Sequence, residues 1–243
     1  MTSHKIPDSP PKPPSYNVQT AVDADTGLIV HHEVTNEPND ARQLYPMAKA
    51  TKDTLGVSSL TVVADAGSSG TTAAACEADG ITACVPTNRS IHSQAGGTMF
   101  GRSAFVYKPE TDTYICPAGH VLARKQEVMR RDRLILYMAR DCTGCSLKPR
   151  CTTAERRFVS RHLHEDALER MNACFHPDPN LIRQRRCASE HPFGTIKRMT
   201  AGGRFLTRGL NKARAEAALS VLAYNIIRTI NLIGAATLRA SLA

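Results

Sequence analysis

The stretch Leu60-Thr-Val-Val-Ala-Asp-Ala-Gly67 decides the fold class that the sequence predicts. Its first five residues form a short apolar run, which is typical of a buried strand, and Asp65 follows directly at the carboxyl end of that run. Open α/β sheets gather their functional residues at the carboxyl ends of the strands. The stretch therefore predicts an α/β sheet with Asp65 as a candidate site residue, and a turn or helix-capping role for Asp65 is the open alternative.

The segments before this strand predict an arm, a hairpin and a helix. Residues 1–15 are rich in proline, which disfavours a central strand and indicates an extended arm. Residues 16–22 and 28–34 alternate like half-buried strands, and Asp23 to Gly27 supplies turn chemistry between them. Apolar positions from Leu44 to Leu55 follow a helical period, and Gly56 is placed to end that helix.

The segments after the strand continue the α/β pattern. Residues 71–78 suit a helix and residues 81–85 suit another strand, so we expect a mixed sheet with helices packed on it. From residue 88 to 161 short alternating pieces dominate, which predicts an inserted β-rich subdomain. Helices are expected again at residues 165–175, 179–190 and 211–233. The last of these carries an apolar stripe that we expect to close the core, made of Leu219, Leu222, Ile226, Ile230 and Ile233.

The charge of the chain is unevenly distributed. Residues 1–90 hold 6 Lys and Arg against 10 Asp and Glu, whereas residues 91–243 hold 25 against 12 and so carry a net charge of +13. The basic part is therefore a candidate surface for a polyanion such as DNA. The amino terminus has no apolar core of a signal peptide, and no run of 18 uncharged apolar residues occurs, so we expect a cytoplasmic protein without a membrane partner.

Four of the eight cysteines have the spacing of a metal site. A Cys-x2-Cys pair, Cys142 and Cys145, lies between Cys116 and Cys151. Tetrahedral Zn²⁺ needs four such soft ligands converging from separate loops, and a small β-rich subdomain gains most from such a cross-link. We therefore expect a structural Zn²⁺ site, with four independent free thiols as the alternative. The other four are interpreted as ordinary small buried residues: Cys76, Cys84, Cys174 and Cys187.

The stretch Arg183-Gln-Arg-Arg-Cys-Ala-Ser-Glu-His-Pro-Phe-Gly-Thr-Ile-Lys-Arg198 sets one carboxylate, Glu190, among five cations. Such a cluster is either a salt-bridged helix face or an acidic metal ligand beside groups that bind phosphate. The candidate DNA-binding cations are Arg183, Arg185, Arg186, Lys197 and Arg198.

Taken together, these motifs resemble bacterial insertion-sequence transposases with a DDE catalytic domain. The resemblance covers about residues 16–234 and rests on four features in the same order. These are Tyr16-Asn-Val-Gln-Thr-Ala-Val-Asp23, Val62-Val-Ala-Asp65-Ala-Gly67, the set Cys116, Cys142, Cys145 and Cys151, and the spacing Arg186-x3-Glu190-x6-Lys197.

The resemblance implies an RNase H-like mixed sheet with flanking helices, interrupted by the β-rich cysteine-containing insertion. It implies that Asp65 and Glu190 are the second and third catalytic acids and hold Mg²⁺ or Mn²⁺, and that Arg186 and Lys197 follow the transposon end. The partners implied are transposon-end and target DNA, with a homo-oligomer as a further expectation. The domains expected are an arm (1–15), the first part of the catalytic domain (16–87), the insertion (88–161) and a helical remainder (162–243).

Three features depart from the family pattern. Arg183 stands where the family often has tyrosine, and Gly67-Ser68-Ser69 replaces a glycine followed by an aromatic residue. The strand with the first acid should precede Tyr16, where only the arm lies, so we expect the chain to be a carboxyl-terminal part that is inactive alone unless an upstream polypeptide supplies that acid. A non-catalytic DNA-binding remnant or regulator and an RNase H-like nuclease are the alternative functions.

Overall fold

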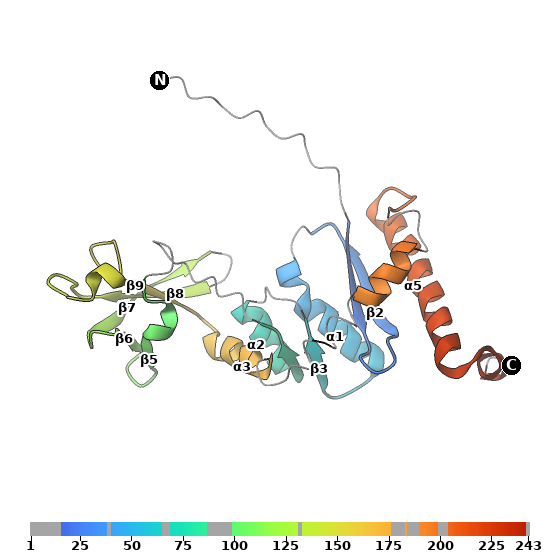
Figure 1. Ribbon diagram of the computed structural model, residues 1–243, viewed down its shortest axis with the longest axis horizontal. Helices are drawn as coiled ribbons and strands as arrows, with labels where there is room; N and C mark the ends of the chain where they lie inside the picture. The colour runs from blue at the N-terminus through green and yellow to red at the C-terminus, as the bar shows by residue number, and fades with distance from the viewer. Residues whose placement is uncertain are drawn as a thin grey trace, which may run out of the picture. The chain divides into compact units, whose positions relative to one another are not determined.

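The computed structural model describes residues 16–37, 40–64, 69–86, 99–130, 133–175, 183, 190–198 and 204–241. The chain divides into two compact units, which are described separately: the hairpin unit (residues 1–60 with 178–243) and the five-strand unit (residues 61–177). The strands are β1 (Asn17–Val22), β2 (Ile29–Thr35), β3 (Leu60–Val63), β4 (Ile81–Cys84), β5 (Val106–Lys108), β6 (Thr113–Ile115), β7 (Val121–Met129), β8 (Arg133–Ala139) and β9 (Phe158–His162). The helices are α1 (Leu44–Leu55), α2 (Gly70–Ala78), α3 (Glu165–Phe175), α5 (Leu210–Ile233) and α6 (Ala235–Ser241), with 3-10 turns at Asp40–Arg42, Arg102–Ala104 and Lys148–Arg150 (Figure 1).

The predicted hairpin is confirmed. Strands β1 and β2 pair antiparallel, and the turn between them is held by Asp23. The Asp23 carboxylate accepts hydrogen bonds from the Thr26 hydroxyl (2.5 Å) and the Thr26 backbone N–H (2.7 Å). The hydrogen bond from the Thr26 hydroxyl is the largest cause of a lowered pKa of Asp23, and the bond from the N–H adds to it. Partial burial opposes the shift. Gly27 completes the turn with a φ of +70°, a conformation that favours glycine.

Two helices pack on β2, in keeping with the helices that the sequence predicts there. Helix α1 buries Ala48 and Thr51 and ends at Gly56, whose φ of +65° is that of a left-handed cap. Helix α5 also packs on β2 (Figure 1). Its Asn225 side chain donates to the carbonyl of Ile29 and accepts from the N–H of the same residue, both at 2.9 Å. The helix therefore satisfies backbone groups of β2 as well as covering its apolar side chains.

The predicted apolar stripe of α5 is wrong. All five residues of that stripe are exposed, from Ile230 at 37% to Leu219 at 68%. The residues that α5 buries are instead Ala213, Ala217, Val221 and Tyr224. Ala213 and Ala217 pack on Val34, while Val221 and Tyr224 pack on Ile29. Small side chains on the inner face let the helix approach the hairpin closely.

The five-strand unit contains an α/β part around α2 and α3. Strands β3 and β4 pair with each other, and Ser69 caps α2 by accepting a hydrogen bond from the Thr72 N–H at 3.2 Å. Cys84 in β4 forms a disulfide with Cys174 in α3, which corrects the interpretation of both as ordinary small buried residues. Cys76 is free and buried, as predicted, and Cys187 lies outside the described residues.

The predicted β-rich character of the inserted segment is also found. Strands β5 to β9 form one antiparallel sheet in sequential order. One face of the sheet carries a core that includes Tyr114, Leu122, Tyr137 and Val159. A sheet in which neighbours in sequence are neighbours in space is built from local pairings, which the short alternating pieces of the sequence indicate.

The chain is therefore a mixed α/β protein, as predicted. The described strands form three separate sheets of two, two and five strands, so the single mixed sheet expected over residues 16–87 is not seen in the described part of the chain. Among the described residues no single helix is long and apolar enough to cross a membrane, although α5 and α6 together, bent by 110°, reach the necessary length and composition.

Candidate functional site

The carboxylate of the predicted cationic cluster lies on a short helix in the hairpin unit. Residues 190–198 are helical, and this segment is called the Glu190 helix below. Its Pro192 is fully buried, and Ile196 packs on the core formed by Ile29, Val221 and Tyr224. Pro192 and Ile196 are four residues apart, so they lie on one face of the helix. That face fixes the helix against α5.

The opposite face of the Glu190 helix is exposed and charged. Glu190, Gly194, Lys197 and Arg198 are all exposed. At 100° a residue, Glu190 and Lys197 point in nearly the same direction, away from the packed face, and are separated by about 10 Å along the axis. The packing that buries Pro192 and Ile196 thus turns one acid and two cations toward solvent.

Gly194 lies between Glu190 and Lys197 on this exposed face, a position that sequence reasoning did not single out. A Cβ placed at Gly194 would meet nothing within 4 Å. Packing therefore does not require a glycine here, and glycine costs helix stability relative to alanine. Its effect is a bare patch of backbone between the acid and the cation, which gives a bulky ligand room to approach.

The salt-bridge interpretation of the cluster stays an open alternative, because Arg185 and Arg186 lie outside the described residues. None of the described residues forms an ion pair with Glu190. Arg183 is helical and exposed, while Arg185 and Arg186 lie outside the described residues, as does Asp65. The meeting of Asp65 with Glu190 accordingly stays a prediction.

The four cysteines of the predicted Zn²⁺ site come together in the five-strand unit. Cys116, Cys142, Cys145 and Cys151 all line one small hollow. All four are unpaired thiols. Within the described ranges no three His, Cys, Asp or Glu side chains are yet arranged as metal ligands.

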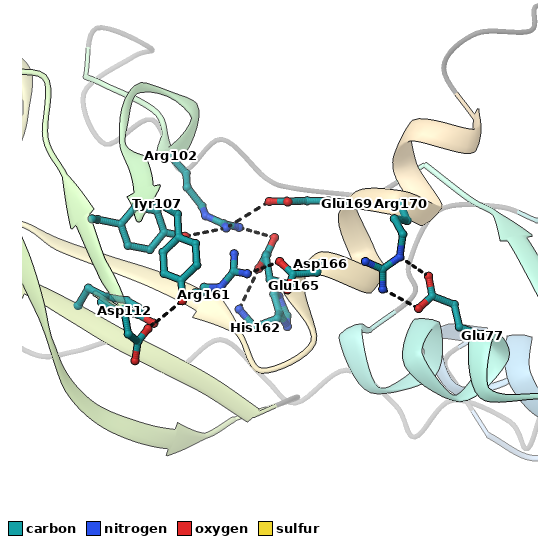
Figure 2. A network of polar contacts seen from close by, with 12 residues as sticks. Glu77, Arg102, Tyr107, Asp112, Arg161, His162, Glu165, Asp166, Glu169 and Arg170 are labelled. Carbon is teal, nitrogen blue, oxygen red and sulfur yellow. Dashed lines mark hydrogen bonds and ion pairs between the residues drawn. The ribbon is translucent and has the colours of Figure 1, made fainter. Parts of the chain in front are cut away.

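A polar network that sequence reasoning missed joins the five-strand sheet to α3 (Figure 2). Arg102 donates to Glu165 at 2.6 Å, and Glu165, which is fully buried, accepts the His162 backbone N–H at 2.9 Å. Arg161 pairs with Asp166 and stacks 4.0 Å above the ring of Tyr107. Because a buried charge must be paired, this network fixes the position of the first turn of α3 against the sheet. It links parts of the fold and leaves no acid free for a reacting group.

The opposite edge of the same network holds a carboxylate at the β5–β6 turn. Asp112 accepts from the hydroxyls of Tyr137 and Tyr107 and pairs with Arg124 at 3.1 Å. The Tyr137 hydrogen bond, the largest cause, lowers the pKa of Asp112, and the bonds from Tyr107 and Arg124 add to it while burial opposes it. These contacts explain Asp112 as a structural residue.

Comparison with known proteins places the exposed acid within a recognised domain. A family model described as a transposase DDE domain matches residues 115–230, slightly less than half of the chain. The match includes Glu190, Lys197 and all four cysteines of the hollow, and begins after Asp65. No curated protein and no solved structure matches the chain. Over residues 115–230 the chain is thus similar to the transposase DDE domain, which supports a DDE-type transposase.

Proposed function

We propose that this protein is a DNA transposase of the DDE type, which binds DNA and acts on its phosphodiester bonds. The observation that carries the proposal is the match to the transposase DDE domain together with the exposure of Glu190 inside the matched segment. Metal-dependent phosphoryl transfer uses carboxylates to hold the metal and cations to hold phosphate, and an exposed carboxylate beside exposed cations supplies part of that set.

The proposed chemistry assigns a role to each side chain of the exposed face. Glu190 offers hard carboxylate oxygens with no ion-pair partner among the described residues, which fits a divalent cation such as Mg²⁺ or Mn²⁺. Asp65 is proposed as the second acid. These two acids would hold a divalent cation, which would supply activation of the attacking oxygen and charge neutralisation at the leaving one. RNase H-like architecture, in which such acids converge, is part of the same proposal.

The cations are proposed to hold the DNA backbone. Lys197 and Arg198 contact phosphates without reading bases, because ammonium and guanidinium groups pair with phosphate oxygens of any sequence. Arg183, Arg185 and Arg186 are proposed as further cations that bind phosphate. The bare backbone at Gly194 leaves room for the DNA strand between Lys197 and Glu190.

The test compares wild type with Glu190→Gln on a supercoiled plasmid that carries the DNA flanking the gene, with Mg²⁺ or Mn²⁺. The reaction is run with the chain alone and with the upstream polypeptide added. Strand joining that requires the metal, appears only with the upstream polypeptide and disappears in Glu190→Gln is the expected result. Glu155→Gln is the matched control, because Glu155 is 84% exposed and lies in the five-strand unit. Cutting without joining would instead identify a nuclease, and DNA binding with no chemistry would identify a DNA-binding remnant or regulator.

A further inference from the structure

The geometry points to a structural Zn²⁺ site formed by Cys116, Cys142, Cys145 and Cys151 in the five-strand unit. We propose that one Zn²⁺ binds these four thiolates and cross-links the loops at one edge of the β5–β9 sheet. The inference does not depend on the proposed transposase activity, because none of its ligands belongs to the Glu190 helix.

Sheet topology explains why cysteines far apart in sequence reach the same place. Cys116 follows β6 directly, and Cys142 follows β8 after two residues. Both strands pair antiparallel with β7, which lies between them, so β6 and β8 run in the same direction and end at the same edge of the sheet. Cys145 and Cys151 belong to the loop that continues from β8. The four thiols therefore converge on one hollow.

The turn at Cys116 has the backbone arrangement of a metal knuckle. The Gly119 N–H donates to the Cys116 carbonyl at 2.8 Å, and the His120 N–H donates to the Cys116 sulfur at 3.3 Å. Gly119 makes this possible with a φ of +81°. An N–H aimed at the sulfur is a hydrogen bond of the kind that orients a metal ligand.

The second turn is built in the same way. Gly144 lies between Cys142 and Cys145 with a φ of +72°, and it meets no atom within 4 Å on the side where a Cβ would lie. A left-handed glycine within a Cys-x2-Cys pair lets both sulfurs face the same side of the turn. The Lys148 N–H then donates to the Cys145 carbonyl at 3.1 Å and continues the chain into the 3-10 turn that precedes Cys151.

Cationic side chains that line the hollow are suited to a negatively charged complex of zinc with thiolates. Four thiolates and one Zn²⁺ carry a net charge of −2. Lys148 and Arg157 both line the hollow, and Arg157 donates to the Cys151 carbonyl at 2.9 Å. Asp141 also lines the hollow, so these side chains together carry a net charge of +1, which offsets part of the negative charge of the complex. Four thiolate ligands leave no open coordination position, so the role is structural rather than catalytic.

Other chemical states of the four thiols agree less well with the structure. They are not paired as disulfides, although the same unit contains the Cys84–Cys174 disulfide. The thiols surround the hollow without yet standing at ligand positions. Ion binding is therefore expected to draw them to about 2.3 Å from the metal. This would tie down the 18-residue loop between β8 and β9, whose regular structure among the described residues is the single 3-10 turn.

The experiment measures metal content in the full chain purified with a reductant and without chelator. We expect one zinc per chain, together with protection of four thiols from alkylation that is lost when a chelator is added. Replacement of Zn²⁺ by Co²⁺ should give the absorption of a tetrahedral thiolate complex in the wild-type protein, so the test does not depend on a variant folding.

Substitutions then identify the ligands. Cys145→Ser should lose its metal to a chelator concentration that wild type withstands. Cys76→Ala is the control that should keep the metal, because Cys76 is buried apart from the hollow and burial raises the pKa of its thiol to about 11. Glu190→Gln should also keep the zinc, which separates this inference from the proposed function. A folded wild-type chain with no zinc and four freely alkylated thiols, or with disulfides among them, would overturn the inference.

Discussion

At the scale of single residues, Gly194 is the position whose role the sequence alone does not reveal. Its place on the exposed face follows only from the burial of Pro192 and Ile196 on the other face. Glu190 and Lys197 are seven residues apart in sequence, but the helix directs both to solvent with bare backbone between them. The spacing of these charged residues therefore shows which surface they share only when the packed face of the helix is known.

Gly194→Ala should therefore separate stability from DNA affinity. The added methyl meets open space, so we expect the unfolding free energy to rise by up to about 1 kcal/mol from helix propensity. DNA affinity should fall, because the methyl lies where the strand is proposed to approach. Thermal unfolding and fluorescence anisotropy with labelled duplex measure the two quantities. Unchanged affinity would show that the strand does not pass over this position.

Glu165 offers a second prediction at the residue scale. Glu165→Gln removes a fully buried charge that pairs with Arg102, so the unfolding free energy should fall by about 2 kcal/mol. Glu169→Gln is the matched control, because Glu169 faces the same guanidinium at 4.0 Å but is 55% exposed, and should cost less than about 0.5 kcal/mol. Urea unfolding measures both. Equal losses would contradict the importance assigned to burial.

At the scale of elements, local sequence patterns predicted where helices and strands begin and end, but they did not predict which face of α5 is buried. The turn at Asp23, the end of α1 at Gly56 and the strands of the β-rich segment all follow from side-chain chemistry acting within a few residues. The buried face of α5 does not. This helix has large apolar residues on more than one side, so a helical period is compatible with several stripes. The hairpin selects the stripe that carries Ala213, Ala217, Val221 and Tyr224.

Two neighbouring residues of α5 test this correction. Val221 is 7% exposed and Leu222 is 56% exposed. Val221→Ala should lower the unfolding free energy by about 2 kcal/mol because it leaves a cavity against β2. Leu222→Ala should change it by less than about 0.5 kcal/mol. Chemical denaturation of the two variants decides the matter, and the reverse order would restore the stripe predicted from the sequence.

At the scale of the whole molecule, the dominant feature is the charge difference between the two parts of the sequence. The net charge of +13 on residues 91–243 predicts that DNA binding depends steeply on salt, because each phosphate contact releases a counterion. Lys197→Ala should weaken binding to all sequences alike and reduce the slope of log affinity against log salt concentration by about 1. Anisotropy titrations over a range of salt concentrations measure the slope. A flat salt response in wild type would contradict DNA binding through this surface.

The candidate site was only partly within reach of the sequence. The cysteine set was singled out by residue type and spacing, because four thiols so spaced are typical of a Zn²⁺ site. The roles predicted for Glu190 and Lys197 came from the family resemblance, because a carboxylate among cations can equally form a salt-bridged helix face. The Arg102–Glu165 pair was not identified, since its members are 63 residues apart and neither has a distinctive sequence context. Long-range partners are fixed by packing, which no local pattern encodes.

The sequence by itself determined the turns, the helix ends, the β-rich segment and the chemistry available at Glu190 and at the four cysteines. These features depend on groups close together in the chain. Tertiary structure alone decided which face of α5 is buried, which face of the Glu190 helix meets solvent, that Cys84 joins Cys174, and that four cysteines share one hollow. The physical reason is that burial and convergence depend on which surfaces pack together, and strand order and direction set those contacts over long distances in sequence.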